Sequence, residues 1–199
     1  MKRQNKSIMK MVGIAFMMAL VVVMQGLTGM IPPIGGFSIS LVLIPIVLGA
    51  AVYGPLAGAL LGATFGTIVY INCVTGVDPG GAMVFQANPV LCFLVVMGKG
   101  ILAGFISGMV YKLLKDKNAY IAMMAAAIVC PIVNTGVFVA CMFLFFIDVL
   151  AAWAGGANIV GYVLTGLILA NFVPELIINI VFSPAGQRIY QIVQRKNLK

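Results

Sequence analysis

The chain has 199 residues, of which 63% are hydrophobic and only 8% are charged. Soluble domains carry about a quarter charged residues, so this composition excludes a water-soluble fold and predicts one compact integral membrane domain, residues 1–199. The net charge of +8 gathers beside the apolar segments, where it favours anionic lipid headgroups rather than nucleic acid.

Six apolar segments follow one another along the chain. Because the runs are continuous and not alternating, they favour transmembrane helices over barrel strands. In chain order we predict spans at 11–27, 39–53, 56–73, 89–114, 119–147 and 159–182. The fifth is longer than a hydrocarbon core of about 30 Å requires, so we expect it to tilt or project. The predicted fold class is an all-α integral membrane protein, a compact bundle of six transmembrane helices.

Basic residues predict the orientation of these spans. All lysines and arginines except Lys99 precede the first span, separate the fourth from the fifth, or follow the sixth. The loops on the opposite side contain only Asp78 and Asp148 as charged residues. By the positive-inside rule both termini are cytoplasmic. No A-x-A-like cleavage site follows the first span, so we expect a retained helix and not a signal peptide.

Several kinds of chemistry are excluded by residues that the sequence lacks. It has no histidine, which excludes histidine-activated nucleophiles and histidine-ligated metals. Its four cysteines form no C-x-x-C pair, and no Walker-type loop is present. We therefore expect no catalytic residue, no metal and no cofactor, and we do not expect an enzyme. Apolar packing is favoured for all four cysteines, and a disulfide between Cys73 and Cys92 remains open.

Small residues recur at four-residue spacing in three spans. Glycines occupy positions 54, 58, 62 and 66 of the third span and positions 100, 104 and 108 of the fourth. Such stripes let helix backbones approach closely, and packing within this chain is the favoured interpretation. For the pair Ala15 and Ala19 on the first helix, internal packing and contact with a partner both remain open.

Lys99, within "VVMGKGILAG", is the only basic residue predicted at membrane depth. Ionisable groups inside a helical bundle usually face its interior and mark a pathway or a ligand. Two interpretations remain open. Lys99 pairs with Glu175 on the sixth span, or it binds a carboxylate of an anionic substrate, which we favour slightly.

Other polar residues are candidates for the same site. Asn171, Glu175 and Asn179 recur every four residues and share one face of the sixth span, although Asn179 lies near the cytoplasmic side. Polar side chains in membranes also form modest interhelical hydrogen bonds, which is the alternative role. We expect a polar cavity whose substrate-binding residues are drawn from Lys99, Asn134, Asn171, Glu175, Asn88, Gln86 and Trp153. In this set Gln86 and Asn88 belong to a gating loop, and Trp153 is more often an interfacial anchor.

Three sequence motifs are similar to those of a known family. They are "ISLVLIPIVLGAAVYGPLAGALLGATFG" (39–66), "PIVNTGVF" (131–138) and the A-x-x-x-A pair at Ala15 and Ala19. On these motifs the chain resembles the substrate-binding S component of an energy-coupling factor (ECF) vitamin transporter, nearest to pantothenate-type members. The basic residue of the family's fourth helix, often arginine after proline, appears here as Lys99.

The resemblance implies a function and partners. It implies capture of a vitamin or related micronutrient, with a pantothenate-like carboxylate favoured, for ATP-driven uptake across a bacterial plasma membrane. The implied partners are a transmembrane coupling subunit, which Ala15 and Ala19 contact, and two ABC-type ATPases. An S component for another vitamin such as riboflavin or folate, or a self-sufficient small membrane carrier, is the alternative.

Overall fold

The computed structural model describes residues 2–30 and 41–197, in which the chain forms helices and no strand. Among the described residues, five helical stretches are long and apolar enough to cross a membrane, and α2 is a shorter apolar helix. The elements are α1 (Lys2–Met30), α2 (Leu43–Tyr53), α3 (Pro55–Thr75), α4 (Pro79–Ala87), α5 (Pro89–Leu114), α6 (Ala119–Phe145), α7 (Ile147–Ala154), α8 (Ile159–Tyr162), the π-helical segment η1 (Val163–Phe172) and α9 (Val173–Asn197).

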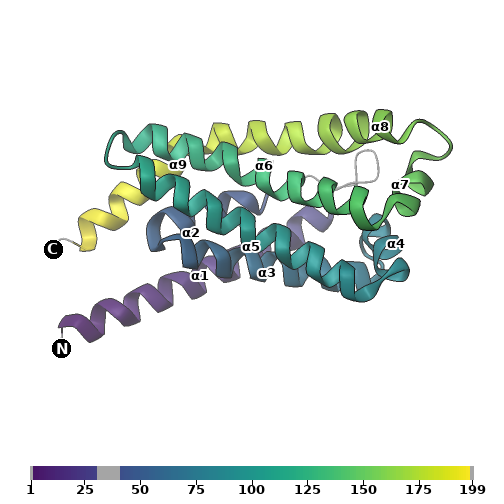
Figure 1. The fold of residues 1–199 in the computed structure, drawn as a ribbon. Coiled ribbons are helices and arrows are strands. Elements are labelled where there is room, and N and C mark those ends of the chain that lie inside the picture. The colour runs from purple at the N-terminus through teal and green to yellow at the C-terminus, as the bar shows by residue number, and fades with distance from the viewer. Residues whose placement is uncertain (1, 31–40, 198–199) are drawn as a thin grey trace.

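The long helices lie side by side and define two ends of the bundle (Figure 1). The short helices α4 and α7 lie at one end, which we call the α4–α7 end. The beginning of α1 and the end of α9 lie at the other, which we call the terminal end. The predicted placement of both chain ends on one side of the bundle therefore agrees with the arrangement of the helices.

The predicted spans agree with the helices in position and differ at some ends. The fourth predicted span has the bounds of α5, and α6 begins at the predicted residue. Helix α1 continues through Gly26 to Met30, because one glycine inside a helix costs only about 1 kcal/mol. The predicted sixth span corresponds to α8, η1 and α9 in succession, which continue to Asn197. Residues 39 and 40 of the second span lie outside the described residues.

Two helices occupy segments that we expected to be loops. Helix α4 begins with Pro79 at its first turn, a position where the missing N–H of proline costs no hydrogen bond. Helix α7 ends at Gly155, whose φ of 58° is left-handed, and glycine adopts that conformation without strain. Both helices are short, with nine residues in α4 and eight in α7, and neither is long enough to cross a membrane.

The glycine stripes of α3 and α5 face each other, which confirms packing within this chain for their helical members, whereas Gly54 precedes α3 with a φ of 98° and has no atom within 4 Å of an added Cβ. A Cβ atom added at Gly62 would overlap the carbonyl oxygen of Gly100, and one added at Gly58 would overlap that of Gly104. The two backbones therefore touch directly. In lipid such close approach stabilises a helix pair through dispersion contacts that larger side chains would prevent.

The buried apolar side chains form two clusters along the bundle axis. One includes Leu43, Leu61 and Ala103 and lies toward the terminal end. The other includes Cys92, Val96 and Leu150 and lies toward the α4–α7 end. On α5 the two clusters meet between Val96 and Ala103, and Lys99 occupies this boundary.

We expect Gly62→Ala to lower the stability of the folded protein, because its methyl group meets the rigid backbone of α5. Overpacking of this kind costs about 1–3 kcal/mol. Gly136, which has no atom within 4 Å of an added Cβ, provides the matched control, and Gly136→Ala should be neutral or stabilising by about 0.5–1 kcal/mol. Thermal unfolding in detergent measures both. A Gly62→Ala variant as stable as the parent would show that α3 and α5 do not touch.

Candidate functional site

Lys99 lies inside the bundle and faces two aromatic rings. It is ten residues from the start of α5, which corresponds to about 15 Å along the helix. Its Nζ atom lies 4.7 Å from the ring centroid of Phe138 on α6 and 5.7 Å from that of Phe65 on α3. Both distances fall within the range of cation–π attraction. The side chain is half-buried, so the rings do not enclose it completely.

A tryptophan extends this aromatic group toward the α4–α7 end. Trp153 of α7 stacks on Phe138, with ring centroids 6.5 Å apart and an interplanar angle of 27°. Helix α7 is thereby positioned against the face of α6 that carries Phe138. Trp153, which sequence considerations favoured as an interfacial anchor, is adjacent to the ring that contacts Lys99.

Two asparagines present side-chain oxygens that lack partners. Asn134 lies one turn from Phe138 on α6, is 5% exposed, and its Oδ1 has no hydrogen-bond partner among the described residues. Asn171 of η1 is half-buried, and its Oδ1 is also without one. Because a buried acceptor without a donor costs about 1–3 kcal/mol, such atoms indicate a place where a ligand or water donates a hydrogen bond.

The polar face of the sixth span is longer than we predicted. Asn171, Glu175 and Asn179 continue at the same four-residue spacing with Ser183 and Gln187. The side chains of the last four are almost fully buried. The spacing alone was sufficient to find Ser183 and Gln187, but both lie near or beyond the predicted end of the span.

Glu175 lies in the inner part of this polar face and is 2% exposed. Asn179 donates a hydrogen bond from Nδ2 to the backbone carbonyl of Glu175 at 2.8 Å. The pairing of Lys99 with Glu175, the alternative interpretation of the sequence, stays a prediction.

Gln86 and Asn88 lie in and after α4 and not in an extended loop. Gln86 is exposed on α4. The Asn88 side chain accepts a hydrogen bond from the backbone N–H of Leu91 at 3.0 Å and thereby caps the start of α5. The structure therefore assigns Asn88 a helix-capping interaction and does not bring Gln86 into contact with Lys99.

Ala15 and Ala19 are exposed on α1, whereas Met17 and Val21 of the same helix are buried. The alanine pair therefore faces away from this chain's core. Cys73 and Cys92 are both buried and unbonded, although their side chains are in contact. They belong to the apolar cluster at the α4–α7 end.

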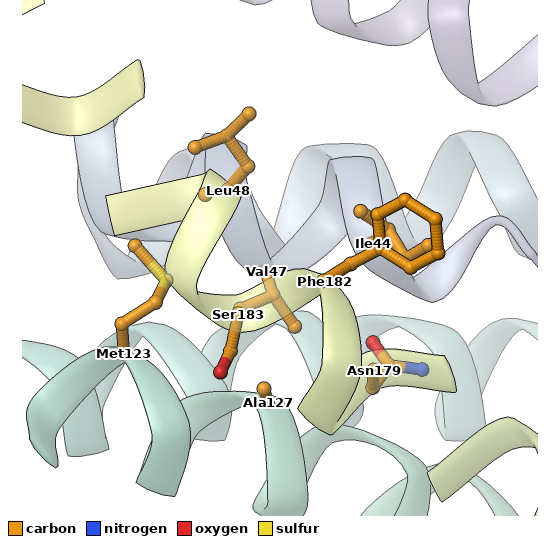
Figure 2. Close-up of a pocket in the computed structure, with 9 residues that line it drawn as sticks. Ile44, Val47, Leu48, Met123, Ala127, Asn179, Phe182 and Ser183 are labelled. Atoms are coloured by element: carbon orange, nitrogen blue, oxygen red, sulfur yellow. The ribbon is translucent and has the colours of Figure 1, made fainter. Parts of the chain in front are cut away.

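A small cavity lies between α2, α6 and α9, away from Lys99 (Figure 2). Its volume is about 20 Å³, enough for about one water molecule and too small for a vitamin. Asn179 and Ser183 are its polar lining residues, and apolar side chains and Gly186 form the rest. In Figure 2 the Ser183 hydroxyl points toward Ala127 of α6. This cavity is not the candidate substrate site.

An ionisable side chain inside a bundle of membrane-length helices indicates a functional site, and the family of the chain gives that site a context. The chain matches the family model "ECF transporter, substrate-specific component" over residues 9–186, and it belongs to this family. No curated protein sequence matches the chain. It is accordingly a multi-pass membrane protein and a substrate-binding subunit that works with an ECF module, and it is a transport subunit and not an enzyme.

Proposed function

We propose that this S component captures a carboxylated micronutrient, with pantothenate favoured, from the α4–α7 end of the bundle. The observation that carries the proposal is the half-buried Lys99 ammonium between Phe65 and Phe138. Inside a membrane such a charge is costly unless it serves a partner or a ligand. An ammonium has three N–H donors, and a carboxylate is the ligand that accepts from them most strongly.

The neighbouring asparagines support a substrate that also carries donors. The side-chain oxygens of Asn134 and Asn171 have no hydrogen-bond partner within the described part of the chain and would accept hydrogen bonds from hydroxyl or amide groups. Pantothenate combines a carboxylate with two hydroxyls and one amide, so its groups match this set. Riboflavin has no carboxylate, and folate has two; identification of the compound that the purified protein retains distinguishes them from pantothenate.

Glu175 would have a secondary role at this site, next to that of Lys99. Its carboxylate would attract the Lys99 ammonium when the site is empty. A buried carboxylate also repels an anionic substrate, so the substrate carboxylate should bind on the side of Lys99 away from Glu175. The Lys99 ammonium can therefore interact with the Glu175 carboxylate on one side and with the substrate carboxylate on the other.

We further propose that the terminal end faces the cytoplasm of a bacterial cell and that the α4–α7 end faces outward. The basic residues outside Lys99 lie in the first turns of α1, around the α5–α6 turn and in or after the C-terminal half of α9, which supports this orientation. A coupling subunit and two ABC-type ATPases would supply the energy. The exposed Ala15 and Ala19 support α1 as the helix that contacts the coupling subunit.

We predict that Lys99→Met will weaken pantothenate binding by some hundreds-fold to thousands-fold. The change leaves a buried carboxylate without its partner, which costs on the order of 3–5 kcal/mol. Pantothenol, the alcohol analogue, has no carboxylate and should lose much less. Titration followed by Trp153 fluorescence, or by calorimetry, compares the two compounds, and Lys112→Met outside the site serves as the matched control.

If Lys99 pairs only with Glu175 and does not contact the substrate, we expect a change in stability and not in substrate affinity. Lys99→Met should then destabilise the protein, and Glu175→Gln added to it should restore stability. Equal losses for pantothenate and pantothenol, together with this rescue, would contradict the proposed substrate contact.

The orientation predicts which positions react with a membrane-impermeant thiol reagent. In a variant whose own cysteines are replaced, Asp78→Cys should be labelled from outside intact cells and Lys115→Cys only after the cells are opened. Both residues lie in segments between helices, so a cysteine there should be tolerated. Labelling of Asp78→Cys only after opening would reverse the proposed topology.

For the partner surface, we expect the double change Ala15→Leu and Ala19→Leu to abolish copurification with the coupling subunit. Leucine side chains prevent the close helix approach that alanines permit. Substrate binding by the isolated protein should be unchanged because both positions are exposed and far from Lys99. Ala140→Leu, also exposed but on α6, should have no effect on either readout. Loss of folded protein in the double variant would instead indicate internal packing.

A further inference from the structure

The contacts of Lys99 raise the question of how its charge is stabilised when the site is empty. Two aromatic rings lie close to the ammonium: its Nζ atom is 4.7 Å from the centroid of the Phe138 ring and 5.7 Å from that of the Phe65 ring. Neither sequence motif nor spacing assigned a function to these two phenylalanines. Both are within the roughly 6 Å over which a ring face attracts a cation.

An aromatic ring and a carboxylate stabilise an ammonium in different ways. A carboxylate neutralises the charge and repels an incoming anion, whereas a ring attracts the cation through its quadrupole and carries no net charge. A ring against Lys99 therefore attracts the ammonium without placing a negative charge beside it that would repel an anionic substrate. Because the Lys99 side chain is only half-buried, the rings leave part of the ammonium, which has three N–H donors, open to a substrate.

Phe138 is the better placed of the two rings. It is closer to Nζ than Phe65 is, and it lies one helical turn from Asn134, whose Oδ1 lacks a partner. The stacked Trp153 ring supports it from α7. The lysine, the asparagine and the tryptophan thus all lie next to Phe138.

We infer that Phe138 is a positioning residue that holds the Lys99 ammonium against its ring face and thereby prepares it to bind an anionic substrate. Its effect on substrate affinity rests on the proposed function, whereas its effect on Lys99 itself does not. Phe65 contributes in the same way but more weakly. Trp153 keeps the Phe138 ring in place.

Stepwise fluorination of the Phe138 ring tests this inference. Phenylalanines with one, two or three ring fluorines are incorporated at position 138 by nonsense suppression, which weakens the ring quadrupole and nearly preserves its shape. The affinity for pantothenate should fall with each fluorine, to a total of roughly 3- to 30-fold, the range that cation–π energies imply. The affinity for pantothenol should stay constant. A packing role alone would not produce a graded loss confined to the carboxylate.

Control rings are available in the same chain. Fluorination at Phe65 should give a smaller graded loss, in keeping with its longer distance. Phe85 packs edge-on against Tyr70 and has no contact with Lys99 among the described cation–π pairs, so its fluorination should have no effect. Equal losses at Phe85 and Phe138 would overturn the inference.

A second readout does not depend on the substrate. Acetic anhydride acylates only the uncharged amine of lysine, so a ring that favours the ammonium slows the acylation of Lys99, which mass spectrometry quantifies. Fluorination of Phe138 should accelerate this reaction in the empty protein. An unchanged rate across the series would overturn the inference whatever the substrate is. An accelerated rate together with no pantothenate binding by the parent protein would support the role of Phe138 and contradict the proposed substrate.

Discussion

The direct backbone contact between α3 and α5 is the constraint on which the site depends. Gly58 and Gly62 of α3 touch Gly104 and Gly100 of α5, so the two helices approach more closely than ordinary side chains allow. The same approach brings the Phe65 ring to 3.4 Å from the place where a Gly100 Cβ would lie. Lys99, the neighbour of Gly100, is thereby held next to that ring. Larger residues in the stripes would separate the helices and move Lys99 away from Phe65.

This contact leaves Lys99 at the boundary of two apolar clusters. Lys99 comes from α5, Asn134 from α6, and Asn171 and Glu175 from the helical stretch that η1 and α9 form. Apolar packing on either side excludes water from most of the surroundings, which strengthens electrostatic interactions inside. A substrate carboxylate that reaches Lys99 would therefore be bound more strongly than by an exposed lysine, where an ion pair contributes only about 0–1 kcal/mol.

Long apolar runs, and the proline, asparagine and lysine residues at their ends, made most of the fold predictable from sequence. The bounds of α5 follow from "NP" at 88–89 and from the lysines after Leu114, and the start of α6 follows from the cap residue Asn118. The short helices α4 and α7 were not predicted, because a segment of eight or nine residues carries little periodic signal. The π-helical segment was also not predicted. It ends where Val173 donates its N–H to the Ile168 carbonyl five residues earlier, just before Pro174, which has no N–H to continue the α-helical pattern.

The candidate site was predictable only in its polar part. Lys99, Asn134, Asn171 and Glu175 were identifiable because polar residues are rare in apolar spans. Phe65 and Phe138 were not, because a phenylalanine that faces a cation has the same sequence signature as one that fills a core. The Asn88 side chain caps α5, and a capping asparagine before a proline is equally typical of a loop residue that contacts a ligand. Only three-dimensional contacts show which of the two roles such a phenylalanine or asparagine has.

The most direct test of the central claim, that Lys99 binds the carboxylate of a captured micronutrient, is the identity of the compound that the protein retains. The protein is purified from cells without added vitamin, the bound compound is released by denaturation, and mass spectrometry identifies it. The account predicts a carboxylic acid, pantothenate in the favoured case, that is present with the parent protein and absent from Lys99→Met. A retained compound without a carboxylate, or the same acid retained equally by Lys99→Met, would contradict it.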